Sequence, residues 1–197
     1  MLLNRFENLL MNNPCRAFVQ RRFEAPRLLA LGGAAAGGAA LEIGCGRGVG
    51  VELILDLFDV DTVDAFDLDP RMVSLARRRL ERRRPAGLWV GSGTSVPVAD
   101  ESYDAVFDFG ILHHIRDWRR AVAEIARVLK PGGRLYAEEV LEPFIRRTRW
   151  LLEHPRADRF DAEQFRAALE NSGLSVVGWR QSWGCIAWYA ARKPAPA

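Results

Sequence analysis

Short hydrophobic runs alternate with amphipathic segments along most of the chain. The runs predict strands near 39–43, 61–67, 87–91, 104–109 and 133–140. Between them, apolar residues recur at helical spacing and predict helices at 48–58, 70–84 and 117–129. Strands that alternate with helices favour right-handed crossovers and a parallel sheet. We therefore expect an α/β fold built on a doubly wound, mostly parallel sheet.

The pattern changes after residue 140. A connector over 141–158 precedes a predicted helix at 162–171. Two β-type runs follow at 174–181 and 185–192, separated by Ser182-Trp183-Gly184. Two strands joined by so short a polar and glycine-containing segment predict a hairpin. We expect this hairpin to close the sheet with antiparallel strands.

The first 31 residues carry no strand pattern. Leu2, Leu3, Phe6, Leu9 and Leu10 sit at helical spacing, and Pro14 opens a second helical run through Phe18, Val19 and Phe23. Three interpretations stay open for this segment: a lid over the site, a helix on a membrane surface, or plain packing. The Ala/Gly-rich segment 32–40 predicts a flexible joint, which favours the lid.

Length and composition fit one domain. The chain has 197 residues, of which 49% are hydrophobic. Its three cysteines (Cys15, Cys45, Cys185) are scattered and form no C-x-x-C pair, so neither a disulfide framework nor a metal site is expected. No signal peptide or membrane-spanning run is evident, which predicts a cytoplasmic protein.

The net charge of +3 is too small to establish a nucleic-acid partner. The densest basic cluster, 77–84, falls on the predicted helix 70–84, whose apolar stripe faces the other way. A solvated helix face is therefore favoured over an RNA or phospholipid docking patch. The docking patch remains the alternative.

Candidate chemistry begins at Leu41-Glu42-Ile43-Gly44-Cys45-Gly46-Arg47-Gly48. This is a buried strand that runs into a glycine turn, and its glycines let the backbone approach a ligand closely. The next helix points its free N–H groups at the same place. Asp67 ends the following strand, about 20 residues on, where dinucleotide-type folds place an acceptor for ribose hydroxyls. The pattern predicts a ligand with an adenosine-like ribose, but Val49 stands where a dinucleotide fingerprint needs its third glycine.

With this E-x-G-x-G-x-G pattern the chain resembles the class I S-adenosylmethionine-dependent methyltransferases. Later motifs arrive in the family's order: Leu68-Asp69-Pro70-Arg71-Met72, Gly91-Ser92-Gly93-Thr94-Ser95-Val96-Pro97, Ile111-Leu112-His113-His114 and Leu129-Lys130-Pro131-Gly132-Gly133. The resemblance is close over 39–140 and looser elsewhere. The last two motifs are most similar to those of ubiquinone/menaquinone-type and related small-molecule members.

The resemblance implies S-adenosyl-L-methionine as cofactor, with S-adenosyl-L-homocysteine as product. Asp67 then takes the ribose hydroxyls, while Leu68 and Met72 line the adenine side. Ser92 stands where most relatives carry an acid, and its hydroxyl can accept the same hydrogen bond; a loop-capping serine is the alternative. The implied cofactor-binding residues are Glu42, Gly44, Cys45, Gly46, Gly48, Asp67, Leu68, Met72, Ser92, Gly93 and Phe109.

An acceptor that must lose a proton requires a base. His113, His114 and Glu139 are the candidates, with His114 favoured slightly over His113. In the alternative interpretation the two histidines are simply loop sequence, with one ring packed and one solvated. Glu139 then makes a structural hydrogen bond to a loop.

The resemblance divides a single domain 1–197 into a helical lid (1–31), a cofactor-binding core (39–140) and an acceptor-side region (141–197). No N-P-P-Y-type or Pro-Cys motif ends the strand at 104–109, so a small apolar or aromatic acceptor is favoured over nucleic acid. The aromatic residues expected around it are Phe6, Phe18, Phe144, Trp150 and Trp183. The alternatives are a methyltransferase acting on phospholipid or RNA, a non-catalytic nucleotide-binding module and a nicotinamide dehydrogenase. The N-terminal helices leave peripheral membrane contact open, and the sequence gives no oligomeric state.

Overall fold

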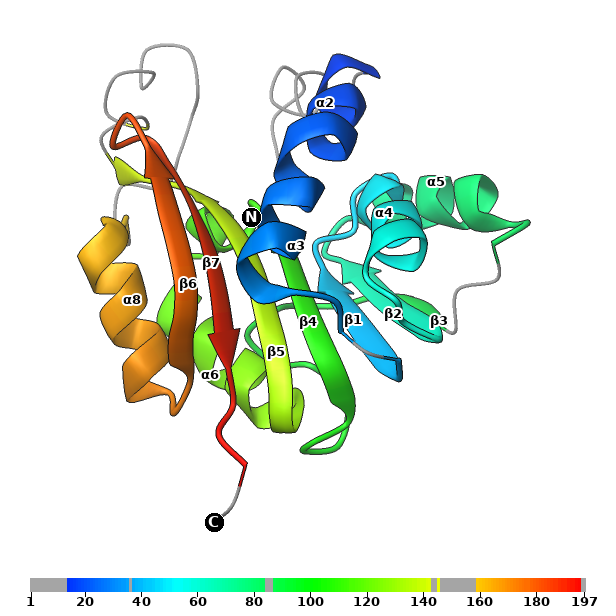
Figure 1. Ribbon diagram of the computed structural model, residues 1–197. Helices are drawn as coiled ribbons and strands as arrows, with labels where there is room; N and C mark the ends of the chain where they lie inside the picture. Colours follow the sequence, from blue (N-terminus) through cyan, green and yellow to red (C-terminus); the bar gives the residue numbers. More distant parts are fainter. Residues whose placement is uncertain (1–13, 36, 84–86, 143–144, 146–158, 196–197) are drawn as a thin grey trace.

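A seven-stranded sheet in the order β3-β2-β1-β4-β5-β7-β6 forms the centre of the computed structural model (Figure 1). The structure describes residues 14–35, 37–83, 87–142, 145 and 159–195. Neighbouring strands pair in parallel except at β7, which is antiparallel to both β5 and β6. The strands are β1 (Ala39–Ile43), β2 (Thr62–Asp67), β3 (Gly87–Val90), β4 (Tyr103–Phe109), β5 (Leu129–Val140), β6 (Ser175–Ser182) and β7 (Ile186–Arg192). The α/β fold and its closing hairpin are confirmed.

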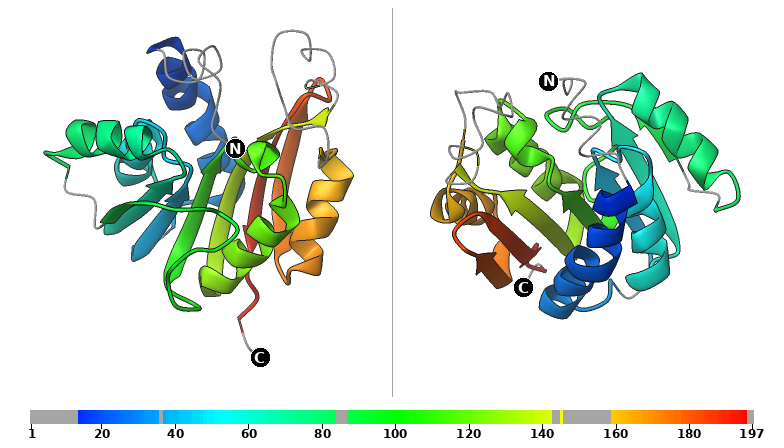
Figure 2. Two further views of the ribbon diagram at one scale, coloured as in Figure 1. Left: turned by 180° about the vertical axis from the view of Figure 1, so that it is seen from behind. Right: turned by 90° about the horizontal axis from the view of Figure 1, so that it is seen from above.

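Helices cover both faces of the sheet (Figure 2). On one face lie α3 (Ala25–Gly32), α4 (Val49–Leu57) and α5 (Pro70–Leu80), and on the other lie α6 (Trp118–Val128) and α8 (Ala162–Asn171). The segments α2 (Pro14–Val19) and η1 (Gln20–Glu24) run directly into α3. None of the helices in the described part of the chain is both long enough and apolar enough to cross a membrane.

Successive side chains of β4 point to opposite faces of the sheet, and the core has one layer on each face. Ala105 and Phe107 point into the layer of α3, α4 and α5, whereas Val106 points into the layer of α6 and α8. Because β4 is central, both faces of the strand are buried and its sequence is hydrophobic at most positions. In the first layer the rings of Phe58, Phe107 and Tyr136 pack at centroid distances of 4.7 to 5.0 Å.

Several predicted boundaries were wrong. The helix expected over 70–84 ends at Leu80 and is followed by a turn. The arginine-rich residues that follow offer no apolar face, and Pro85 disfavours helix in the residue before it. The segment 129–132, expected as a helix end and a turn, belongs to β5, where Leu129 pairs with Tyr103.

The Ala/Gly-rich segment after α3, expected to be a flexible joint, has described residues that are hydrogen-bonded to the backbone at the end of α4. Ala35 N donates to Phe58 O at 2.8 Å, and Gly37 N donates to Asp59 O at 2.6 Å. Gly32 lies so close to Tyr136 that a Cβ atom there would stand 2.4 Å from the ring. Both ends of the segment are therefore fixed against the sheet layer that contains α4.

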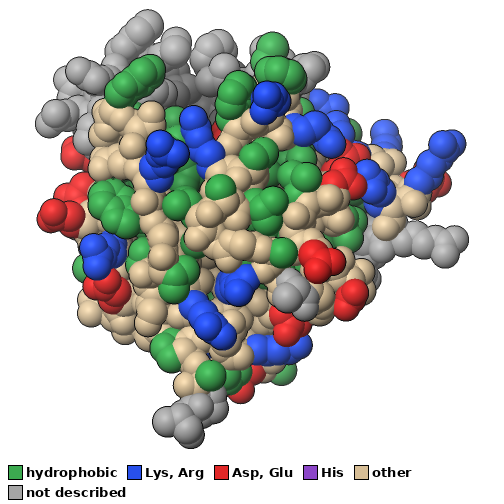
Figure 3. Space-filling model, in the orientation of Figure 1, with side chains coloured by type: hydrophobic (Ala, Val, Ile, Leu, Met, Phe, Trp, Pro, Cys, Tyr) green, Lys and Arg blue, Asp and Glu red, His purple; other side chains and the backbone are tan. Residues whose placement is uncertain are grey.

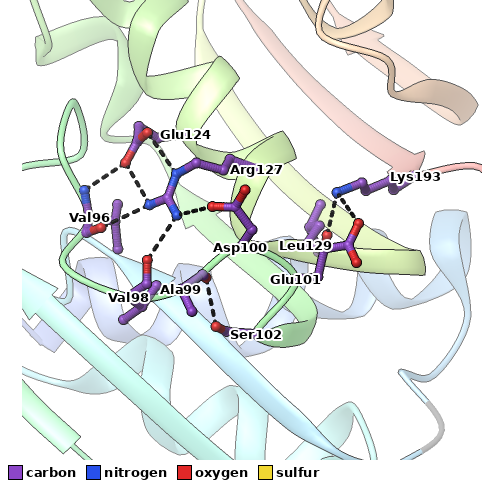
Figure 4. A network of polar contacts seen from close by, with 10 residues as sticks. All are labelled: Val96, Val98, Ala99, Asp100, Glu101, Ser102, Glu124, Arg127, Leu129 and Lys193. Carbon is purple, nitrogen blue, oxygen red and sulfur yellow. Dashed lines mark hydrogen bonds and ion pairs between the residues drawn. The ribbon is translucent and has the colours of Figure 1, made fainter.

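Arg127 ties the loop 96–102 to α6 (Figure 4). Its guanidinium donates to the backbone carbonyls of Val96 and Val98 at 2.9 and 2.8 Å and pairs with Asp100 at 2.8 Å. Glu124, which pairs with Arg127 at 2.9 Å, also accepts a hydrogen bond from Val96 N at 2.8 Å. This network fixes the loop that leads out of the Ser92–Thr94 segment.

We expect Arg127→Ala to lower the free energy of unfolding by about 2 kcal/mol, because it leaves partly buried carbonyls and a carboxylate without their charged donor. The matched control is Arg166→Ala, which removes only a surface pair with Glu170. That change should cost less than about 0.5 kcal/mol. Chemical denaturation of the two variants measures both values, and equal losses would contradict a structural role for the Arg127 network.

The same network has a predictable pH dependence. Hydrogen bonds from Arg127 hold the pKa of Glu124 below its ordinary value. A carboxylate with a lowered folded-state pKa stabilises the fold above its unfolded pKa, and this stabilisation is lost as the pH falls through the folded-state pKa. The difference in unfolding free energy between wild type and Arg127→Ala should therefore shrink on acidification below about pH 4.

Candidate functional site

A cavity of about 600 Å³ lies at the carboxyl ends of β1, β2 and β4. Its walls come from the glycine turn after β1, the end of β2, the segment 91–94, the segment 109–117 and the helical segment α2–η1. The strand order reverses between β1 and β4, and ligands of doubly wound folds bind at such a reversal.

The glycine turn holds the backbone in conformations that other residues rarely adopt. Gly44, Gly46 and Gly48 have φ of 69°, 50° and 82°. A Cβ atom at Gly44 would also lie 2.5 Å from Ile111 Cγ1. Gly44, Cys45 and Gly46 line the cavity, whereas Gly48 is the N-cap of α4 and lies outside its lining. Burial raises the pKa of the Cys45 thiol, which disfavours a thiolate there.

Glu42 lies beneath this turn with only 2% of its surface exposed. Its carboxylate accepts a hydrogen bond from the backbone of Val51, in the first turn of α4. Its Oε2 atom has no hydrogen-bond partner in the described structure and belongs to a residue that lines the cavity. Burial and the negative charge of Asp67 raise the pKa of Glu42 well above its ordinary value. The residue therefore offers an unused acceptor in a place that favours a positively charged neighbour.

Asp67 connects the glycine turn to the loop after β2. Its Oδ2 accepts from Gly46 N at 2.9 Å and its Oδ1 accepts from Asp69 N at 2.8 Å. Burial raises the pKa of this carboxyl, while the backbone donors oppose that shift. Leu68 and Met72 follow it into the cavity wall, Leu68 half-exposed and Met72 buried.

Ser92 and Gly93 also line the cavity, together with Thr94, which the sequence interpretation missed. Ser92 Oγ lies 2.9 Å from Thr94 Oγ1 and accepts from Thr94 N at 3.3 Å. The loop-capping bond is thus present, and the same hydroxyl stays at the cavity wall. Phe109 lines the cavity from the end of β4.

The three candidate bases occupy different places. Glu139 is fully buried behind the 3₁₀ turn η2 (Leu112–His114), accepts from Leu112 N at 2.8 Å, and lies 2.6 Å from His113 Nδ1. Burial raises the pKa of Glu139 to about 7. Of the three, only His114 lines the cavity. Both rings are buried, so neither is the solvated ring of the alternative interpretation.

The helical segment α2–η1 supplies cavity residues that carry no local sequence signal. Arg16, Ala17 and Gln20 form this wall. Arg16 pairs with Glu24 and lies 3.5 Å from Glu138 Oε1 on β5. Arg16 and Glu138 are far apart in the sequence and come together only in the folded chain.

The aromatic residues expected around the acceptor do not line this cavity where the structure describes them. Phe18 and Trp183 are 63% and 95% exposed and do not line the cavity. Phe6, Phe144 and Trp150 lie outside the described residues. Phe66 and Phe109 are the aromatic residues of the lining. Within the described part of the chain, no cluster of His, Cys, Asp and Glu could hold a metal ion.

Gly50 leaves room for the Glu42 carboxylate. A Cβ atom at this helical position would stand 1.8 Å from Glu42 Oε1 and 2.9 Å from Phe109 Cδ2. We expect Gly50→Ala to destabilise the fold by about 1–3 kcal/mol, although alanine favours helix. A double-mutant cycle by chemical denaturation tests the cause. In a Glu42→Ala background the cost of Gly50→Ala should fall clearly, and an unchanged cost would show that Glu42 is not the obstacle.

Known proteins match the chain over the region that carries these motifs. Residues 41–137 match the family model described as a methyltransferase domain. An O-methyltransferase of Penicillium expansum is 28% identical over 70% of this chain and 52% of its own length. A demethylmenaquinone methyltransferase of Corynebacterium efficiens is 32% identical over 57% of this chain and 60% of its own length. The chain thus spans between half and two thirds of these two relatives.

Solved structures show the same fold. A chain of the complex between the Haloferax volcanii Trm112 methyltransferase activator and the putative methyltransferase superposes with a TM-score of 0.77 at 20% identity, covering 93% of this chain and 95% of that chain. A putative methyltransferase of Bacillus halodurans gives a TM-score of 0.72 at 17% identity, covering 87% and 99%. With the matched domain and the ordered motifs, the chain belongs to the class I S-adenosylmethionine-dependent methyltransferases.

Proposed function

We propose that the cavity binds S-adenosyl-L-methionine and that the protein transfers its methyl group to a small apolar or aromatic acceptor. The observation that carries the cofactor assignment is the Glu42 carboxylate at the first turn of α4. A pyrophosphate would need that helix N-terminus for itself. It would instead meet the carboxylate of Glu42, with Asp67 close by.

The residues present fit a cationic cofactor. Glu42 Oε2 is a buried acceptor with no hydrogen-bond partner among the described residues, and an ammonium group can donate to it. Asp67 accepts backbone hydrogen bonds from Gly46, Leu68 and Asp69, and a carboxylate has about four acceptor sites, so acceptor capacity remains for a ribose hydroxyl. The glycine turn offers bare backbone along the same wall. These features support the family's cofactor over NAD or ATP.

The bound cofactor supplies an electrophilic methyl group on a sulfonium, whose positive charge is lost on transfer. The chain's own task is to align an acceptor with that methyl group and to exclude water. Arg16, Ala17 and Gln20 line the cavity from the helical segment α2–η1, and His114 lines it from the η2 turn. We assign His114 the role of base for acceptors that must lose a proton. His113 and Glu139 hold the η2 turn that presents it.

Two observations support a small acceptor. The relatives named above are an O-methyltransferase and a demethylmenaquinone methyltransferase. An RNA or phospholipid acceptor would favour a free arginine cluster on α5. Arg79 and Arg83 instead pair with Glu52 and Asp56 of α4 at 3.1 and 2.8 Å, and Arg77 donates to Leu88 O at 2.7 Å. These arginines serve intramolecular contacts, which supports a small acceptor.

Thermal-shift measurements test the cofactor. At a hundredfold its Kd, S-adenosylmethionine or S-adenosylhomocysteine should add about 2.7 kcal/mol, or about 5–10 °C, while NAD and ATP should give no shift. Asp67→Asn should weaken the affinity at least about tenfold and cut the shift to about half or less. Asp56→Asn, a carboxylate on α4 outside the cavity lining, is the matched control and should keep the full shift. A shift with NAD alone would overturn the assignment.

Turnover separates an enzyme from a non-catalytic binding module. We expect methyl transfer from labelled S-adenosylmethionine to members of a panel of naphthoquinols and phenols, and not to RNA or phospholipid vesicles. His114→Asn should lower the rate about a hundredfold or more while keeping the S-adenosylhomocysteine shift. Transfer that survives in His114→Asn would remove the base role, and cofactor binding without transfer to any acceptor would favour the binding module.

A further inference from the structure

The helical segment that walls the cavity turns an aromatic face away from it. Arg16, Ala17 and Gln20 line the cavity. Phe18 and Phe23, on the outer side, are 63% and 45% exposed. Their rings meet edge to face at 6.4 Å, so they form one small apolar surface rather than two isolated side chains. Val19 extends this surface.

A second aromatic residue projects at the same end of the molecule. Trp183 lies in the turn between β6 and β7, has φ of 49°, and is 95% exposed. Figure 1 and the left view of Figure 2 show α2 and this hairpin turn at the upper end of the molecule, where β1 and β4 also end. The cavity lies at those strand ends. Trp183 adds nothing to the core, and with Phe18 and Phe23 it places exposed aromatic side chains at this end of the molecule.

Basic side chains accompany the aromatic ones. The Arg22 guanidinium lies over the Phe23 ring at 5.8 Å and makes no ion pair with any described residue. Arg21, half-exposed, lies beside it and reaches Glu52 and Asp56 at 3.6 and 3.5 Å. Figure 3 shows hydrophobic and basic side chains together at the upper end of this face. Exposed aromatic residues interspersed with arginine match the interfacial region of a membrane with negative charge.

We propose that Phe18, Val19 and Phe23 on α2–η1, together with Trp183 on the hairpin turn, form a docking surface for an anionic phospholipid bilayer. The aromatic rings enter the headgroup region, and Arg22 meets lipid phosphates. These residues project from two separate elements. A fluid bilayer can contact both elements without being complementary in shape to their arrangement. The proposed contact is peripheral, since it is made by side chains exposed at the surface.

Docking in this way brings the cavity end of the molecule close to the membrane, because one helical segment both walls the cavity and carries the apolar surface. An apolar acceptor dissolved in the bilayer would then reach the cavity without crossing water. The docking itself does not depend on the proposed methyl transfer, since vesicle binding is measured without cofactor or acceptor.

Vesicle co-sedimentation of the full chain tests the proposal. Wild type should bind vesicles that contain phosphatidylglycerol more tightly than pure phosphatidylcholine vesicles, and salt should weaken the difference. Phe18→Ser/Phe23→Ser should lower the partition coefficient at least about tenfold. Trp183→Ser should lower it on both kinds of vesicle. Arg22→Gln should lower it about fivefold on the anionic vesicles alone.

Val177→Ser is the matched control, because Val177 is an exposed apolar residue near the start of β6, at the other end of that strand from Trp183. It should bind as wild type does, and thermal melting should show all variants folded. Absence of wild-type binding to anionic vesicles would overturn the proposal. So would equal binding by wild type and the double phenylalanine variant, which would place any lipid contact elsewhere on the chain.

Discussion

The architecture of the site depends on one buried carboxylate at the carboxyl end of β1. Glu42 is almost fully removed from water, a position that is costly for a charge unless donors compensate it. The first turn of α4 supplies such a donor and the positive end of a helix dipole. The arrangement works only because Gly50 has no side chain. The start of α4, the path of the glycine turn and the shape of the cavity floor all follow from this contact.

Asp67, at the end of β2, is a second carboxylate that organises the backbone of the site. By accepting from Gly46 and Asp69, it fixes the glycine turn and the loop after β2 relative to each other. Two acids that approach one ligand site raise each other's proton affinity, which is unfavourable for an anion and favourable for a cation. The selectivity proposed for a sulfonium cofactor therefore arises from the same carboxylates that organise the backbone.

Acids at the ends of β4 and β5 hold segments that come from elsewhere in the chain. Glu139 holds the η2 turn, and Glu138 accepts from Trp188 Nε1 at 2.6 Å while it lies beside Arg16. Burial and the neighbouring Glu139 raise the pKa of Asp108 well above its ordinary value. The ends of β4 and β5 thus provide hydrogen-bond acceptors in fixed positions. Hydrogen bonds to these acceptors position the cavity walls formed by η2 and α2.

The sequence by itself determined the strands and helices of the core, the glycine turn and the acid at the end of β2. Those features are local, since hydrophobic periodicity, glycine spacing and a fixed offset are written within short stretches of chain. It favoured His114 only slightly over His113, and it missed Thr94, Arg16 and Gln20. It also expected Phe18 and Trp183 around the acceptor, although neither lines the cavity. Only the tertiary structure decided these points, because each depends on residues far apart in sequence: His113 and Glu139 are 26 positions apart, and Arg16 and Phe109 are 93 positions apart. Contacts between distant segments set side-chain direction, and no local pattern encodes them.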